Sequence, residues 1–232
     1  MRFHDTIVLS LSAVTVLALA GCSTVSTPTD GGALSASAPA RQEGEKAPVS
    51  ALLSSAALSK RLLEESDLGE GYARKPQQPE RHDDVMVSGC PALDKLDGAA
   101  AVGGSLAFPR KAKASFTYAG GRDSEVVEEL YSGTEDNLSK GVGRVFEAMT
   151  SCPLYQVLVG ATPVTVTTQR LPAPKLGEER WSQLLTFIAG GHSSVVKQTA
   201  VRTGTVVVVV SGSAALVDDD LAKAVDKADS AL

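Results

Sequence analysis

The sequence predicts an α+β fold, a single domain in which helices pack against a mostly antiparallel sheet. Three strand-like segments, residues 180–189, 193–202 and 205–211, follow one another with short glycine-containing connections, and such connections join antiparallel neighbours. Residues 134–150 carry apolar side chains at helical spacing and predict a helix that covers the sheet. Strands gathered in a meander, with helices elsewhere along the chain, define this fold class.

The folded part is expected to open with a helix. Residues 51–65 carry Leu and Ala at helical spacing, which predicts an amphipathic helix, with a break near Ser59 as the alternative. Residues 66–72 predict the end of this helix and a turn. Residues 76–79 and 81–84 predict loops, because prolines and charged residues replace the apolar pattern there.

A short helix and several strands are expected next. Residues 92–97 predict a brief helix, and residues 105–108 and 112–118 predict two short strands. The second of these strands alternates apolar and polar side chains, which suits a half-buried strand. Residues 119–123 predict a turn, and residues 125–131 favour a strand because their apolar side chains lie between clear turns.

The strongest helix signal covers residues 134–150, with Thr134 or Asp136 as the candidate cap. Gly141 and Gly143 each weaken such a helix by about 1 kcal/mol relative to alanine, and they indicate close packing against the sheet. The apolar stripe consists of Leu138, Val142, Val145, Phe146 and Met149.

The last third of the chain is predicted to be mainly β. Residues 163–170 predict a strand and residues 171–177 a loop. Residues 206–210 are all valine, which predicts a central strand covered on both faces. Residues 218–220 are all aspartate and predict the start of a last helix, because acidic side chains favour the positive end of the helix dipole. The sheet-facing residues of this helix are expected to be Leu221, Val225 and Leu232.

Residues 1–21 predict a signal peptide for export. Arg2 supplies a positive start, and residues 7–20 form an apolar segment that is shorter than the roughly 20 residues of a membrane-spanning helix. The segment ends in Leu-Ala-Gly-Cys at Cys22, which resembles the bacterial lipobox. The resemblance implies cleavage between Gly21 and Cys22 and a diacylglyceryl group on the Cys22 sulfur. An ordinary secreted signal with a chance cysteine is the alternative.

Residues 22–50 predict a disordered tether between a membrane and the domain at residues 51–232. They are rich in Ser, Thr, Gly, Ala and Pro and show no apolar periodicity. Such a segment buries too little surface to offset the entropy lost on ordering. Together with the lipobox, this organisation predicts a protein held on the outer face of the cytoplasmic membrane, where two acyl chains give stable anchoring.

The composition excludes some function classes. The formal net charge is −5 and aromatic residues make up 4% of the chain. A nucleic-acid partner is therefore not expected, since such proteins show a clustered basic face or aromatic stacking platforms. A polybasic contact with anionic lipid is disfavoured for the same reason. The abundance of Ala and Val with few Lys suggests an actinobacterial proteome.

The chain has three cysteines. If Cys22 carries lipid, Cys90 and Cys152 remain, and in an oxidising compartment their default state is one disulfide. Two buried free thiols are the alternative. No metal site is expected, because His82 and His192 have no ligand-like spacing to either cysteine.

The sequence shows no catalytic set, and we expect no cofactor. His82 and His192 are expected to be solvated loop residues, and Gly-x-Ser-x-Gly is absent. Residues 218–220 could attract a cation, although a helix start accounts for them more simply. Trp181 and Tyr155 could line a groove, with a place in or beside the core as the simpler interpretation.

The order of several short motifs resembles a known family. Asp-Leu-Gly-Glu-Gly-Tyr at residues 67–72 is followed by Cys90-Pro91, Val145-Phe146, Cys152-Pro153 and the segment at residues 200–207. This order is similar to the actinobacterial extracellular sensor domain that occurs on PknH-type serine/threonine kinases and on stand-alone lipoproteins. The resemblance covers residues 52–232.

The resemblance implies an α+β domain with a groove proposed to hold an unidentified ligand. Kinase members tend to carry a second disulfide, for which this chain has no further cysteines. No kinase domain is predicted in these residues, so sensing would require a partner. No ligand-binding residues of the family can be transferred to numbered positions.

These observations predict a non-enzymatic, membrane-anchored module that senses or binds a small molecule, an envelope component or a protein. Two alternatives remain at this point. An envelope hydrolase would place His82 or His192 in a cleft beside a Ser, Cys or carboxylate. A carrier of lipid or glycolipid would need a deep apolar cavity.

Overall fold

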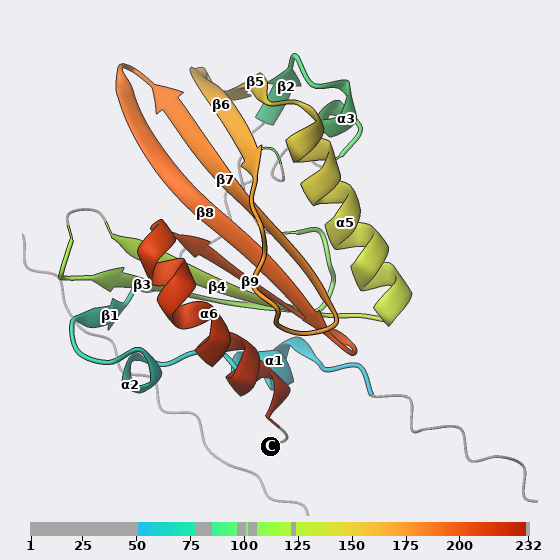
Figure 1. The fold of residues 1–232 in the computed structure, drawn as a ribbon, viewed down its shortest axis with the longest axis vertical. Helices are drawn as coiled ribbons and strands as arrows, with labels where there is room; N and C mark the ends of the chain where they lie inside the picture. Colours follow the sequence, from blue (N-terminus) through green and yellow to red (C-terminus); the bar gives the residue numbers. More distant parts are fainter. Residues whose placement is uncertain (1–50, 78–84, 97–100, 102–105, 122–123, 231–232) are drawn as a thin grey trace, which may run out of the picture. The chain divides into compact units, whose positions relative to one another are not determined.

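The computed structural model describes residues 51–77, 85–96, 101, 106–121 and 124–230. These residues form a single domain with a nine-stranded sheet and five helices (Figure 1). All adjacent strands in the sheet are antiparallel. The predicted α+β class and the mostly antiparallel sheet are therefore confirmed.

The sheet has the strand order β1-β3-β4-β9-β8-β7-β6-β5-β2. Strands β5 to β9 are consecutive in the sequence and adjacent in the sheet, as expected for a meander with short connections. The strands are β1 (Tyr72–Arg74), β2 (Val85–Ser88), β3 (Lys111–Tyr118), β4 (Glu125–Ser132), β5 (Leu154–Val159), β6 (Thr162–Arg170), β7 (Glu179–Ala189), β8 (His192–Thr203) and β9 (Val206–Gly212).

Helices cover the two faces of the sheet separately. The α6 face is packed by α1 (Ser55–Ser59), α2 (Glu65–Leu68) and α6 (Ala214–Asp229). The α5 face is packed by α3 (Pro91–Asp94) and α5 (Glu135–Ser151). In Figure 1, α5 lies beside β6 and β7, and α6 lies over β4, β8 and β9.

Strand β9 lies between these two helical layers, as predicted. Val206, Val208 and Val210 belong to the core on the α6 face, and Val207 and Val209 belong to the core on the α5 face. All five side chains are buried because β9 is central in the sheet and both of its faces meet a helix. An unbroken apolar strand therefore has partners on both sides.

Helix α5 confirms the sequence prediction. Leu138, Val142, Phe146 and Met149 are buried along one side of it. The Thr134 hydroxyl accepts a hydrogen bond from the Asn137 backbone N–H at 3.4 Å, which caps the first turn. The apolar stripe therefore sets which side of the helix faces the sheet.

The predicted helix at residues 51–65 is wrong as a single helix. The structure has two short helices, α1 and α2, and the chain leaves helical geometry after Ser59, as the alternative proposed. The Leu63 backbone N–H donates to the Glu128 carboxylate at 2.6 Å, so this peptide group is bonded to the sheet instead of a helix. This course of the chain buries four leucine side chains, those of Leu58, Leu62, Leu63 and Leu68.

The predicted start of the last helix is also wrong. Helix α6 begins at Ala214, with Ser213 at its N-cap position, so residues 218–220 lie one turn inside it. Leu216 and Val217 pack on the sheet with Leu221 and Val225, which extends the apolar side toward the N-terminus. Leu232 lies outside the described residues.

Some strands of the sheet were not predicted from the alternation of apolar and polar residues. The strands β1, β2 and β5 were not predicted, and residues 106–108 of the predicted strand at 105–108 are not a strand. Leu106 and Phe108 instead pack beside Tyr131, with the Phe108 and Tyr131 ring centroids 5.5 Å apart. The predictions for β3, β4, β6, β7, β8 and the short helix α3 are confirmed within a few residues.

Two glycines in α5 give a test of its packing. A Cβ atom at Gly143 would lie 3.7 Å from Trp181, an ordinary contact, whereas one at Gly141 would lie 2.6 Å from Phe108. We expect Gly143→Ala to raise the free energy of unfolding by about 0.5–1 kcal/mol, because alanine favours the helix. Gly141→Ala should gain less or destabilise, because Phe108 must shift. Urea denaturation of both variants checks this, and equal gains would contradict the packing.

Candidate functional site

A small hollow lies between α5 and the start of β7, and we call it the Trp181 hollow. Its volume is about 190 Å³. Helix α5, the end of β6, the segment that follows β6 and the first residues of β7 form its walls. The lining residues are Phe146, Thr150, Arg170, Leu171, Ala173, Arg180, Trp181 and Ser182.

Two aromatic side chains provide its apolar surface. The rings of Phe146 and Trp181 have centroids 6.4 Å apart and planes at 36°. Phe146 is on the buried side of α5, and Trp181 is only partly buried on the α5 face of β7. The apolar stripe of the helix and the alternation of the strand therefore bring two aromatic residues together from distant parts of the sequence.

The two aromatic residues considered from sequence have different positions. Trp181 is partly buried against the core of the α5 face, as the simpler interpretation predicted, and it also lines the hollow. Tyr155 is a core residue with 2% exposure, and its hydroxyl donates to the Ala101 carbonyl oxygen at 2.6 Å. Phe146, Thr150 and Arg170 were not identified as site residues, because only the tertiary fold places the end of α5 beside the end of β6.

Polar groups lie beside the aromatic pair. Arg170 donates from Nη2 to the Thr150 hydroxyl at 3.1 Å, and Thr150 donates to the Phe146 carbonyl oxygen at 2.7 Å. Arg170 is exposed, and a guanidinium carries five N–H donors in all. The hollow thus combines an aromatic surface with a guanidinium group that can donate hydrogen bonds.

The start of β7 is fixed by a charged cluster on the α5 face. The Arg202 Nε donates to Glu179 at 2.9 Å, and the Ser139 hydroxyl donates to the other oxygen of Glu179 at 3.0 Å. The hydrogen bond from Arg202 holds the pKa of the Glu179 carboxyl below its usual value. These contacts tie β7 to β8 and α5, and so help to position Trp181 two residues later.

The volume of the hollow limits the size of the ligand group that it can hold. Pockets that enclose a whole small molecule are usually about 300–1,000 Å³. A volume of about 190 Å³ suits one ring or one short branch of a ligand. The rest of such a ligand would lie over the surface near Arg170. This hollow is therefore too small to be the deep apolar cavity that a lipid carrier requires.

The residues considered for catalysis or cation binding are not brought together. His192 is exposed at the start of β8, and within the described ranges its side chain has no hydrogen-bond partner. It therefore does not form the pair that the hydrolase alternative requires. His82 lies outside the part of the chain that the structure describes.

The aspartates at residues 218–220 do not form a metal site. Asp218 pairs with Lys197, and Asp220 pairs with Lys223 at 2.9 Å and accepts from the Tyr72 hydroxyl at 2.8 Å. Burial, followed by the bond to Asp220, raises the pKa of the Tyr72 hydroxyl. No group of His, Cys, Asp and Glu in the described ranges could hold a metal ion.

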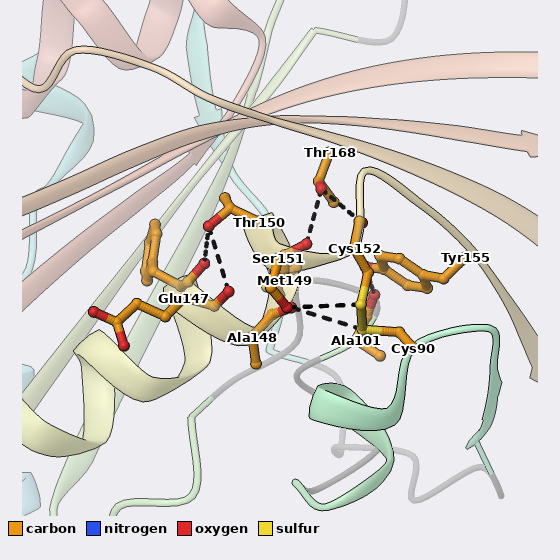
Figure 2. Close-up of a disulfide and its surroundings, with 11 residues drawn as sticks. Cys90, Ala101, Glu147, Ala148, Met149, Thr150, Ser151, Cys152, Tyr155 and Thr168 are labelled. Atoms are coloured by element: carbon orange, nitrogen blue, oxygen red, sulfur yellow. Dashed lines mark hydrogen bonds between the residues drawn. A yellow bond between two sulfur atoms is a disulfide. The ribbon is translucent and has the colours of Figure 1, made fainter.

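Cys90 and Cys152 form the predicted disulfide (Figure 2). Cys90 occupies the N-cap position of α3, Cys152 the C-cap position of α5, and their Cα atoms are 5.7 Å apart. Figure 2 also shows the Thr168 hydroxyl, which donates to the carbonyl oxygens of Met149 and Cys152 at 2.8 and 3.1 Å. The end of α5 is thus joined both to α3 and to β6.

The disulfide stabilises the region next to the Trp181 hollow. It closes a loop with a sequence separation of 62 residues, for which the chain-entropy model gives about 4 kcal/mol. Thr150, a lining residue, lies two residues before Cys152. The bridge therefore restrains the part of α5 that forms one wall of the hollow.

A buried carboxyl group lies on the other face of the sheet. Glu128 is 1% exposed, and one of its oxygens accepts from Leu63. Its other oxygen has no hydrogen-bond partner in the part of the chain that the structure describes. Burial raises its pKa to about 8, although the Leu63 N–H opposes the shift. Alternation along β4 could have identified this position, because Glu128 lies between Val126 and Leu130 on the α6 face.

The lipid-attachment prediction concerns residues that the structure does not describe. Gly21 and Cys22 lie outside the described residues, so cleavage and acylation stay predictions. Among the described residues, no helix is long and apolar enough to cross a membrane.

Comparisons with known proteins find similarity among solved structures. No protein-family model and no curated protein matches the chain. The crystal structure of the extracellular domain of PknH from Mycobacterium tuberculosis is similar, with a TM-score of 0.56 and 17% sequence identity. The match covers 77% of this chain and 97% of that one. At this identity the likeness shows a shared fold, that of a kinase extracellular domain.

The buried Glu128 gives a prediction about pH. A carboxyl with a folded-state pKa of about 8, above its usual 4.5, favours the folded state most when protonated, below pH 4.5. The free energy of unfolding should fall as pH rises from 4.5 to 8, by up to about 1.4 kcal/mol per pH unit. Glu128→Gln should remove this contribution, as measured by denaturation at several pH values.

A matched control for this prediction lies on the same strand. Glu125 is a partly exposed glutamate of β4 that pairs with Lys75 at 2.8 Å. Glu125→Gln should keep the pH dependence of the unmodified chain, because no buried carboxyl is removed. If Glu128→Gln and the unmodified chain show the same slope, the Glu128 carboxyl does not titrate as expected.

Proposed function

We propose that this protein is a membrane-anchored extracytoplasmic lipoprotein whose domain is a non-enzymatic ligand-binding or sensor module. The observation that carries the ligand-binding part is the Trp181 hollow, with its aromatic pair and adjacent Arg170. Likeness to the extracellular domain of a kinase supports an extracytoplasmic sensor role. A small molecule, an envelope component or a protein side chain could supply the group that enters.

The anchor part of the proposal rests on the sequence. Residues 1–21 would be removed as a signal peptide, Cys22 would carry diacylglyceryl, and residues 22–50 would act as the tether. The domain at residues 51–232 would then be held on the outer face of the cytoplasmic membrane as a PknH-like sensor domain of an actinobacterial type. Sensing would pass through a partner protein.

Trp181 allows a direct test because it is the only tryptophan in the sequence. Protein purified from the organism that makes it should carry a small molecule that organic extraction and mass spectrometry detect. Returning that extract to the emptied protein should change Trp181 fluorescence, because the ring lines the hollow. Trp181→Leu should reduce the co-purified compound several-fold.

Tyr118→Leu is the matched control, an aromatic-to-leucine change on β3 away from the hollow. It should retain the compound. The proposed ligand-binding role would be wrong if nothing co-purifies and an envelope extract leaves the fluorescence of Trp181 unchanged.

The anchor has its own test. Cys22→Ser in the full chain should move the protein from the membrane fraction to the soluble fraction, because the sulfur that would carry the lipid is gone. Cys152→Ser is the control, since it removes the disulfide but leaves Cys22 in place. Cell fractionation and immunoblotting measure both, and continued membrane attachment of Cys22→Ser would contradict lipidation.

A further inference from the structure

Among the described residues, no helix covers one part of the α6 face. Helices α1 and α6 pack against β3, β4, β8 and β9. Figure 1 shows the start of β6, the end of β7 and the start of β8 extending beyond α6. The side chains on the α6 face of this extension, together with those of β2 and β5, form what we call the uncharged patch.

The strand registers arrange the uncharged patch in rows across the sheet. Each row consists of directly paired residues that point to the same face. The rows are Met86-Leu158-Pro163, Ser88-Gln156-Thr165-Ile188-Ser193, Leu154-Thr167-Thr186-Val195 and Gln169-Leu184. The neighbouring residues Tyr155, Val157 and Val166 point to the α5 face and are buried there, which confirms the assignment of faces.

Large apolar side chains are concentrated on this patch. The exposed fraction is 62% for Met86, 59% for Leu154, 43% for Ile188 and 52% for Val195. Leu52 is the one other large apolar side chain that the described part of the chain exposes, at 38%. Exposed apolar side chains that share one surface mark an interaction site, whereas scattered ones do not.

The patch also lacks charge, although 21% of the chain is Asp, Glu, Lys or Arg. Among the described residues, the first charged residue at its border is Lys197, which pairs with Leu184 across the strands and forms an ion pair with Asp218 of α6. Depletion of charged residues is the compositional mark of the centre of a protein–protein interface.

We propose that the uncharged patch is the contact surface between two copies of this chain. A net charge of −5 opposes association through the charged faces, whereas this surface brings no like charges together. The surface consists of Thr, Ser, Gln and aliphatic side chains, so two copies that face each other match in polarity. Two copies related by a twofold axis would stack their sheets face to face, about 10 Å apart.

The area of the patch is small for a protein–protein interface. Strand spacing and residue rise give the patch about 400–500 Å² of sheet plane. A standard interface buries about 800 Å² on each partner, so this dimer belongs to the small, transient class. We therefore expect a dissociation constant between about 10 µM and 1 mM.

Sedimentation velocity of residues 23–232, which include the whole described domain, tests the proposal. The sedimentation coefficient should rise from the monomer value toward the dimer value between about 10 µM and 1 mM. Gln156→Lys should hold the protein at the monomer value over this range. Gln156 is exposed in the second row, so the substitution places a cation on both facing surfaces without changing the core.

Thr162→Lys is the matched control. Thr162 is exposed on β6, but it pairs with Val159 and so belongs to the α5 face. The Thr162→Lys variant should self-associate like the unmodified chain. A second patch variant, Thr167→Lys, should be monomeric. The proposal is overturned if the unmodified chain stays monomeric at about 1 mM, or if association persists in both patch variants.

Discussion

The burial of β9 on both faces is the constraint on which the rest of the domain depends. Its five consecutive valines need apolar partners on each side, and α6 and α5 supply them. Once β9 is central, β4 and β8 must flank it, and the meander of β5 to β8 extends the sheet in one direction. The α5 face beside this meander is where the Trp181 hollow forms.

The hollow and the disulfide share one structural support, the end of α5. The bridge from Cys152 to Cys90 and the hydrogen bonds from Thr168 fix the last turn of the helix. Phe146 and Thr150 precede Cys152 by six and two residues. Their side chains therefore meet Trp181 and Arg170 in a defined geometry. A ligand site on this scaffold would be largely formed before binding.

Periodic patterns predicted the elements with a clear buried side. The stripe of α5, the alternation of β3 and the valine run of β9 are confirmed because each pattern reflects burial on a fixed side. Short elements were missed or misplaced. The strand β1 has three residues, and α1 and α2 replace one longer helix because Leu63 bonds to Glu128 of a distant strand. A contact across 65 positions leaves no local signal.

The sequence by itself determined the fold class, the pairing of Cys90 with Cys152 and the two-sided cover of β9, since periodicity and cysteine number depend on local order. Only the tertiary structure decided the rest. Within the described ranges, it placed Phe146 beside Trp181, buried Glu128 with one unpartnered oxygen, and left one part of the sheet without a helix. These features depend on which elements meet in space, and residue spacing along the chain does not encode that.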